Sequence, residues 1–224
     1  IVLRRDSGLR ISASTVGRIL AYLRRRGVLP EPARSRRPRR RPSPRPYAVR
    51  LPRGYRVERP GDLVEIDTFE IRLPGITRPY RQFTARDRCS RWDVLELRRT
   101  ATARAAASVL EAIVARMPFE VRAISVDGGS EFMAEFEAIS PEREIRLFVL
   151  PPRSPKLNGA VERANRTHTE EFYEVTDAEP EFEALAAELA DWEICSNTVR
   201  PHQALGYLTP REWLIANGYL PAEV

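Results

Sequence analysis

Residues 30–46 limit how this chain can fold more than any other part of the sequence. They contain seven arginines and six prolines, with a single acidic residue. Proline lacks a backbone N–H donor and stiffens the chain toward an extended form, so this segment is expected to be a spacer and not a packed element. The chain is therefore divided into a short N-terminal region (1–29), a basic Pro/Arg-rich linker (30–59) and a globular region (60–224).

The charge follows the same division. Residues 1–60 carry 18 arginines and three acidic residues, whereas residues 61–224 carry 19 Lys and Arg against 28 acidic residues. A basic arm on an acidic globule indicates a polyanion partner for the arm, and bound metal cations would let the acidic part lie beside that polyanion. Four linker arginines are expected to contact phosphates, with a merely solvated linker as the alternative: Arg36, Arg37, Arg39 and Arg40.

The overall composition excludes several classes of protein. With 42% hydrophobic and 30% charged residues the chain can bury a core, which excludes wholesale disorder. No apolar run approaches the ~20 residues needed to cross a bilayer, and none resembles a signal peptide. Two isolated cysteines, Cys89 and Cys195, argue against a disulfide scaffold and a zinc finger and favour a reducing cytoplasm. Because the first residue is Ile and not Met, we expect further sequence upstream.

Residues 12–27 predict an amphipathic helix. Four apolar residues recur at i, i+3, i+4 and i+7 and form one stripe: Val16, Ile19, Leu20 and Leu23. Ser12 can cap the start of this helix and Gly27 can end it. Arg18 and Arg25 lie off the stripe, as expected for a recognition helix that enters a major groove. A surface helix with a solvated basic side fits equally well, because a helix-turn-helix needs partner helices that the sequence does not reveal.

From residue 60 the pattern is that of an α/β domain. Hydrophobic periodicity predicts three strands, a helix, a strand, a short helix, a strand and two helices: 62–73, 79–86, 91–97, 102–117, 121–127, 130–138, 145–149, 158–175 and 180–196. This order is typical of a mixed sheet covered by helices. The expected buried stripes of the helices over 102–117 and 158–175 are Val109, Leu110, Ile113 and Val114, and Val161, Ala164, His168, Phe172 and Val175.

Three acidic residues stand out by their context. Asp67 interrupts an otherwise apolar strand, where a carboxylate is costly unless it is paired or metal-bound. Asp127 ends a second apolar strand directly before two glycines, at the carboxyl end where sites in such sheets lie. Glu162 opens a helix at the boundary between core and solvent. Carboxylates from two strands and a helix can converge on a pair of hard divalent ions such as Mg²⁺, although each acid alone also fits a structural or solvated role.

Other polar residues have plainer interpretations. Three acids are interpreted as turn or surface groups: Asp62, Asp87 and Asp93. Glu131 is expected to support a helix N-terminus near the site, and His168 to be a core histidine. His202 fits a structural role at least as well as DNA contact. Three residues near Glu162 are expected to contact DNA, because phosphates must approach that edge: Lys156, Asn158 and Arg166.

Four phrases resemble, in order, the signature of the integrase catalytic core family: EIDTF, SVDGGSEF, PPRSPKLNGAVERANRT and NTVRPHQALGYLTPREW. The resemblance covers roughly residues 60–215 and is to DDE transposases of bacterial insertion sequences, which are related to retroviral integrases. It implies a ribonuclease H-like fold, a mixed five-stranded sheet flanked by helices, preceded by the C-terminal part of a helix-turn-helix region. It also implies that Asp67, Asp127 and Glu162 are catalytic acids that hold two Mg²⁺ or Mn²⁺ ions per active site.

The function that this resemblance implies is that of a metal-dependent DNA transposase or integrase. Such an enzyme cleaves DNA ends and transfers strands by in-line transesterification, as a homodimer or larger assembly on double-stranded DNA, here in the bacterial cytoplasm with the nucleoid. A ribonuclease H-like nuclease that does not join strands is one alternative, and a DNA-binding regulator with a vestigial catalytic core is another. The phrase NTVRPHQALGYLTPREW argues against the first, and the three intact acids argue against the second.

Overall fold

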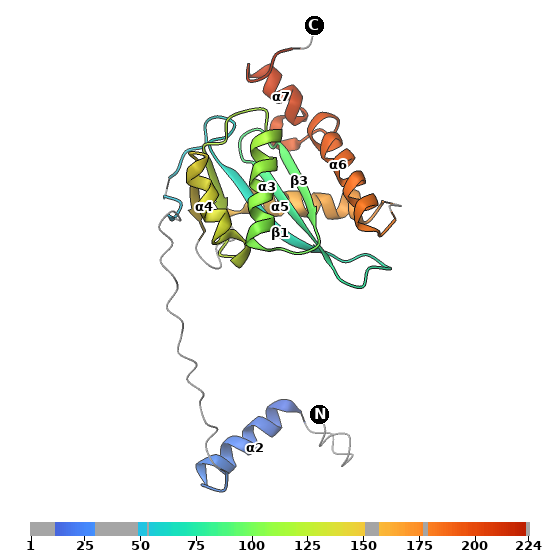
Figure 1. Cartoon of the computed structure of the whole chain (residues 1–224). Coiled ribbons are helices and arrows are strands. Elements are labelled where there is room, and N and C mark those ends of the chain that lie inside the picture. The colour runs from blue at the N-terminus through green and yellow to red at the C-terminus, as the bar shows by residue number, and fades with distance from the viewer. Residues whose placement is uncertain (1–11, 30–48, 53, 151–156, 177–178, 223–224) are drawn as a thin grey trace. The chain divides into compact units, whose positions relative to one another are not determined.

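The structure is a computed structural model that describes residues 12–29, 49–52, 54–150, 157–176 and 179–222. The chain divides into two compact units, residues 1–44 and residues 45–224 (Figure 1). Within the described parts of the chain, no helix is both long and apolar enough to cross a membrane.

In the first unit the predicted helix is confirmed as α2 (Ala13–Arg25). Ser12 is its N-cap, with the side-chain oxygen accepting a hydrogen bond from the backbone N–H of Thr15 at 3.1 Å. After the helix, Gly27 has a φ of +70°, which glycine adopts without strain. The apolar stripe is partly open to solvent, with Ile19 47% exposed. A partner helix for it is not among the described residues, so the helix-turn-helix stays a prediction.

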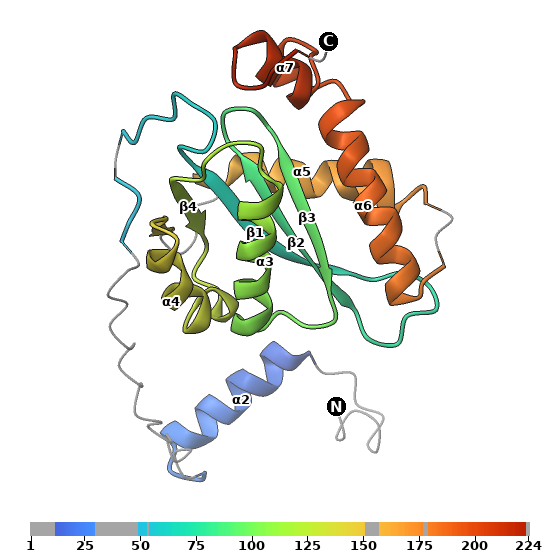
Figure 2. The same ribbon diagram turned by 45° about the horizontal axis from the view of Figure 1, so that its top comes forward.

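The second unit contains the predicted mixed five-stranded sheet (Figure 2). Its strands are β1 (Val64–Ile71), β2 (Tyr80–Asp87), β3 (Asp93–Arg98), β4 (Ala123–Val126) and β5 (Arg146–Val149), in the spatial order β3-β2-β1-β4-β5. The first three strands form an antiparallel meander, whereas β4 and β5 run parallel to β1. This arrangement places β1 in the middle of the sheet, where both of its faces are covered.

Helices cover the two faces of this sheet. They are α3 (Ala103–Arg116), α4 (Glu135–Glu142), α5 (Gly159–His168), α6 (Phe182–Thr198) and α7 (Pro210–Ala216), with short helical turns η1 (Ser130–Phe132), η3 (Thr169–Tyr173) and η4 (Gln203–Leu205). Side chains of α3, η1 and α4 pack with Val64, Ile66 and Phe83 in one core. Side chains of η3 and α6 pack with Leu95 and Leu97 in a second core, on the opposite face. Alternation along β1 directs Glu65, Asp67 and Phe69 to that second face.

The prediction that Val175 and Val114 lie in the core is wrong. Val175 is 66% exposed because α5 passes into the π-helical turn η3, which ends at Tyr173 and leaves Val175 beyond the helix. A π turn carries an extra residue, so it also rotates later positions out of the 3.6-residue phase. Val114 of α3 is 37% exposed, and Ala106 is buried instead.

Two features of the second unit lie outside the predicted elements. Helix α7 follows a capping box in which Thr209 and Glu212 exchange hydrogen bonds, a sequence signal for a helix start. The described end of the predicted linker also packs on the sheet, since Val49 bridges to Phe148 of β5. Three further side chains from this end pack against the edge cluster of Leu63, Ala123 and Phe148: Leu51, Tyr55 and Val57.

Candidate active site

Strands β1 and β4 bring Asp67 and Asp127 together. The parallel register pairs Ile66 with Val126, so the two aspartates are the next positions on adjoining strands. One carboxylate oxygen of Asp127 accepts a hydrogen bond from the backbone N–H of Gly129 at 2.8 Å. A Cβ atom at Gly129 would lie 2.8 Å from that oxygen and 2.7 Å from a carboxylate oxygen of Glu131. Glycine at this turn therefore leaves room for both acidic side chains.

Helix α5 adds Glu162 to the two aspartates. Asn165, one turn further along α5, donates a hydrogen bond from Nδ2 to Oδ2 of Asp67 at 2.8 Å and ties the helix to β1. Asp67 is half-buried, whereas Asp127 and Glu162 are exposed. Burial, and then the negative charges of Asp127 and Glu162, raise the pKa of Asp67 to about 6. Asp127 and Glu162 therefore lie near enough to Asp67 for their charges to act on it.

No arginine compensates this repulsion within the described residues. Many other carboxylates of this arginine-rich chain have such a partner, including Asp62 with Arg122 and Glu96 with Arg116. Across the described ranges, no group of three or more Asp, Glu, His or Cys side chains is close enough to hold a metal ion as it stands. Uncompensated carboxylate oxygens are nevertheless the donors that Mg²⁺ and Mn²⁺ prefer, so this donor set fits a hard divalent cation.

Glu65 is a residue of this site that the sequence analysis missed. Its Oε2 atom accepts hydrogen bonds from the backbone N–H groups of Ala160 and Val161, each at 3.0 Å, and the side chain is buried. A carboxylate there satisfies the free donors of the first turn of α5 and suits the helix dipole. Glu65 therefore holds the start of the helix that carries Glu162. The available signal was a second acid on the same strand face, two residues before Asp67.

The expected DNA contacts have mixed positions. Arg166 is exposed and forms an ion pair with Glu170 at 2.6 Å, one turn along the helix. Asn158 precedes α5 as its N-cap residue, but its side chain is buried and does not cap the helix. Arg18 and Arg25 are exposed on α2. The other five lie outside the described residues: Arg36, Arg37, Arg39, Arg40 and Lys156.

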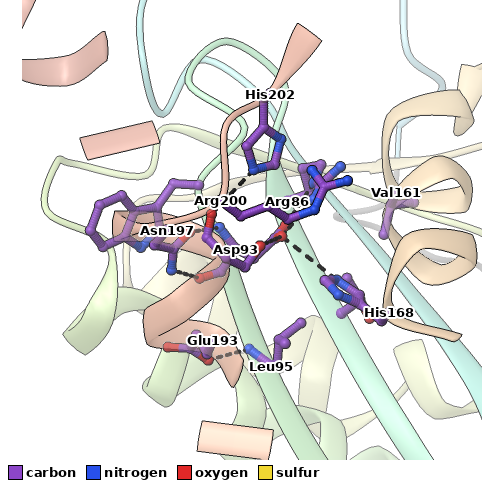
Figure 3. A network of polar contacts seen from close by, with 12 residues as sticks. Arg86, Asp93, Leu95, Val161, His168, Glu193, Asn197, Arg200 and His202 are labelled. Carbon is purple, nitrogen blue, oxygen red and sulfur yellow. Dashed lines mark hydrogen bonds and ion pairs between the residues drawn. The ribbon is translucent and has the colours of Figure 1, made fainter. Parts of the chain in front are cut away.

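Asp93 is neither a turn acid nor a surface acid, so that expectation is wrong for Asp93. Asp93 is fully buried and accepts two hydrogen bonds from Arg86, at 2.7 and 2.6 Å (Figure 3). The cause is that Arg86 is its register partner across β2 and β3, and α6 closes over both. Ser196 of α6 donates to Asp93 at 3.1 Å. Asp87 is buried but is a turn acid as predicted, since it accepts from the backbone N–H groups of Cys89 and Ser90 in the β2–β3 turn. Asp62 also lies at a turn.

Both histidines belong to the same buried network. His168 is a core histidine as predicted, and Trp192 donates to its Nδ1 atom at 2.9 Å. Burial lowers the pKa of His168 to about 4, so the neutral ring carries its proton on Nε2, which lies 3.6 Å from Asp93. Nε2 of His202 lies 3.2 Å from the carbonyl oxygen of Ser196. His202 therefore fastens the loop after α6 to that helix, which is a structural role.

Comparison with known proteins identifies the domain. Two sequence models, both described as integrase core domain, match residues 57–155 and 143–210. No curated protein matches the sequence. Among solved structures, a chain of the simian T-cell lymphotropic virus intasome, in complex with a PP2A regulatory subunit, matches with a TM-score of 0.60 and 19% identity. That match covers 74% of this chain and 57% of the viral chain, so the present chain spans little more than half of that protein.

Two isolated viral domains are similar over nearly their whole length. The catalytic core domain of BIV integrase has a TM-score of 0.55 and 22% identity, covering 70% of this chain and 95% of that domain. The HTLV-2 integrase core in complex with magnesium has a TM-score of 0.53 and 14% identity, covering 68% and 94%. At these identities the likeness shows the ribonuclease H-like fold alone. The two sequence models, however, run together from residue 57 to residue 210 and include all three acids, and the chain therefore belongs to the integrase core family, with a DDE-type core.

Proposed function

We propose that this protein is a metal-dependent DNA transposase or integrase. It would cleave DNA ends and join them to a target by in-line phosphodiester transesterification. The observation that carries the proposal is the meeting of Asp67, Asp127 and Glu162 in an integrase core without an arginine partner among the described residues. A polynucleotidyl transferase needs such a site, because divalent cations would supply the missing positive charges and would also bind the phosphate oxygens of DNA.

The side chains have separable roles in this reaction. Asp67, Asp127 and Glu162 would hold two Mg²⁺ or Mn²⁺ ions, which when bound supply Lewis-acid activation of the nucleophile and stabilise the leaving oxygen. Asn165 fixes the rotamer of Asp67, and Glu65 fixes the first turn of α5. The donors are thus held in place before DNA arrives. Direct attack by water or a DNA 3′-hydroxyl needs no covalent protein intermediate, so no Ser or Tyr nucleophile is required.

The partners follow from the same proposal. Arginines of α2 and of residues 30–46 would add contacts to DNA phosphates that do not depend on sequence. The similar viral structures are an intasome and cores in dimeric and trimeric forms, which supports a homodimer or larger assembly for joining two ends. The insertion-sequence resemblance supports a bacterial cytoplasmic location with the nucleoid.

The test is to measure strand transfer and duplex binding together for Glu162→Gln, Asp67→Asn and Asp127→Asn. The substrate is a duplex that carries the inverted repeats flanking the gene, in Mg²⁺ and in EDTA. Each variant should lose about 10²-fold or more in rate, and EDTA should abolish activity. Binding should be kept or tightened, because removing a carboxylate lessens repulsion of phosphate.

Asp191→Asn is the matched control, because Asp191 is an exposed acid on α6 away from the site. It should join strands at the wild-type rate. Near wild-type joining by Glu162→Gln, or undiminished cleavage in EDTA, would reject the proposal. Cleavage without joining would favour a ribonuclease H-like nuclease instead.

A further inference from the structure

A basic cleft lies beside α5, apart from the three acids. Its volume is about 690 Å³, and its walls come from the start of β1, the β2–β3 turn, α5 and the loop after α6. Five arginines line it: Arg86, Arg88, Arg91, Arg163 and Arg200. Glu65 is the one carboxylate among its lining residues in the described chain; its Oε2 atom accepts from the start of α5, and its Oε1 atom lies 3.8 Å from Nε of Arg88.

Helix α5 separates this cleft from the catalytic acids. Ala160, Arg163 and Thr167 line the cleft, whereas Asn165 contacts Asp67 on the other side of the helix. At about 100° per residue, Arg163 and Thr167 point roughly 160° away from Asn165. A ligand in the cleft therefore does not occupy the position between the acids, and the two sites share only the helix and Glu65.

Two of the five arginines form a fixed floor. Arg86 is held by both carboxylate oxygens of the buried Asp93 (Figure 3). Arg200 donates to both carboxylate oxygens of Glu171, with the Nε contact at 2.6 Å. These two guanidinium groups have their partners within the fold, and together with His202 they define the shape of the cleft.

Arg91 and Arg163 are different, because neither makes a hydrogen bond or an ion pair through its side chain to another described residue. The Nε atom of Arg91 is buried without a partner. Burial, and then the charge of Arg86, lower the pKa of the Arg91 guanidinium, which means that its surroundings disfavour the positive charge. Its backbone φ of +63° is also uncommon for a residue other than glycine. The charges of Glu65 and Asp87 offset only part of this fall in the pKa, so an anion in the cleft would stabilise the charged guanidinium.

We propose that this cleft binds the phosphate backbone of a second DNA segment, separate from the one that reacts at the acids. The inference rests on the proposed function, which requires an element end and a target duplex at the same core. Guanidinium groups present paired N–H donors that match phosphate oxygens. Arg91 and Arg163 would contact the phosphates directly, above the floor of Arg86 and Arg200.

The test compares two double variants that remove the same charge. Arg91→Gln/Arg163→Gln removes the unpaired cleft arginines. Arg78→Gln/Arg104→Gln removes two exposed arginines that are outside the cleft lining. Affinity for a labelled random-sequence duplex is measured in EDTA over a salt series. Each lost phosphate contact should reduce the slope of log affinity against log salt by about 0.9, so the cleft variant should lose about 2 and the control should keep the wild-type slope.

A stability measurement excludes a merely structural explanation. The cleft variant should unfold at the same or a higher temperature than the wild type, because it removes groups that repel each other. The proposal is overturned if the cleft variant keeps the wild-type slope, or if both variants lose the same amount of slope. It is also overturned if the unfolding temperature of the cleft variant falls so far that unfolding accounts for the weaker binding. Inorganic phosphate at constant ionic strength should weaken DNA binding by the wild type more than by the cleft variant, because phosphate and the DNA backbone compete for the same guanidinium groups. An equal effect on both proteins would also overturn the proposal.

The salt-slope measurement and the strand-transfer measurement can fail separately. If the wild type joins strands but the cleft variant keeps its salt slope, the cleft proposal fails alone. If the slopes differ as expected but the wild type joins no strands in Mg²⁺, the proposed function fails and the cleft remains a DNA-binding surface.

Discussion

Two carboxylates on the same face of the same sheet, Asp93 and Asp67, have opposite electrostatic surroundings. Asp93, on β3, receives two hydrogen bonds from Arg86 and one from Ser196. Asp67, on β1, receives hydrogen bonds only from neutral amides, those of the Asn165 side chain and the Thr68 backbone, and faces the charges of two other acids. Arginine is abundant in this chain, so composition does not explain the difference. A carboxylate that the fold neutralises serves the fold, whereas one that the fold leaves unneutralised is available to a ligand.

The largest expected effect comes from replacing each of these two aspartates by asparagine. Asp93→Asn leaves the guanidinium of Arg86 buried without its counter-charge, so it should cost about 3–5 kcal/mol in the free energy of unfolding. Asp67→Asn removes repulsion and should leave that free energy unchanged or higher. Urea denaturation of both variants at pH 7 measures the contrast. Equal losses of stability in the two variants would mean that the acids near Asp67 also hold the fold together.

This contrast also marks how far the sequence could predict the structure. Periodicity along one segment predicts the strands and helices, and the resemblance to the integrase core family implies which acids form the site. The burial of Asp93 depends on Ser196 and Asn197, about 100 positions away, which reach it only after α6 packs on the sheet. Local sequence around Asp93 contains no sign of these partners, so a turn acid and a buried ion pair look alike.

The role of Glu65 could not be predicted from the sequence for a related reason. An acid in a strand that faces a helix start cannot be told from a solvated acid until the position of α5 is known. The π turn η3 was likewise not predicted, because it changes the phase of an otherwise regular apolar stripe. By contrast, the capping box at Thr209 was readable in the sequence, and α7 could have been predicted from it.

A smaller effect is expected at Glu65, whose carboxylate accepts hydrogen bonds from the first turn of α5. Glu65→Gln keeps an oxygen acceptor but removes the charge that faces the first turn of α5. Because Glu65 positions Glu162 through the first turn of α5, strand transfer should fall about 10- to 100-fold, mainly in turnover and in the Mg²⁺ concentration required. Affinity for duplex DNA should stay unchanged or increase, because Glu65 also lines the basic cleft, where its negative charge opposes phosphate.

Glu135→Gln is the matched control for Glu65→Gln, because Glu135 is an exposed acid in the first turn of α4. It should leave the Mg²⁺ requirement unaltered. If Glu65→Gln weakened DNA binding and turnover equally, Glu65 would act on DNA and not through α5.

The smallest expected effect is a pH-dependent change in stability at Glu193, which like Asp93 has an arginine partner. Glu193 of α6 accepts a hydrogen bond from the backbone N–H of Leu95 at 2.5 Å and lies 3.3 Å from Arg116. Burial raises the pKa of Glu193 to about 7, from an ordinary value of 4.5. Between these two pH values the folded protein keeps a proton that the unfolded chain releases, so this carboxyl lowers stability as pH rises from about 4.5 to about 7. Glu193→Gln cannot ionise, so its stability relative to the wild type should increase across that range by on the order of 1 to 2 kcal/mol and then level off. Denaturant unfolding of both proteins at pH 5 and pH 8 measures the change, and a difference that is the same at both pH values would show that Arg116 neutralises Glu193 as fully as Arg86 neutralises Asp93.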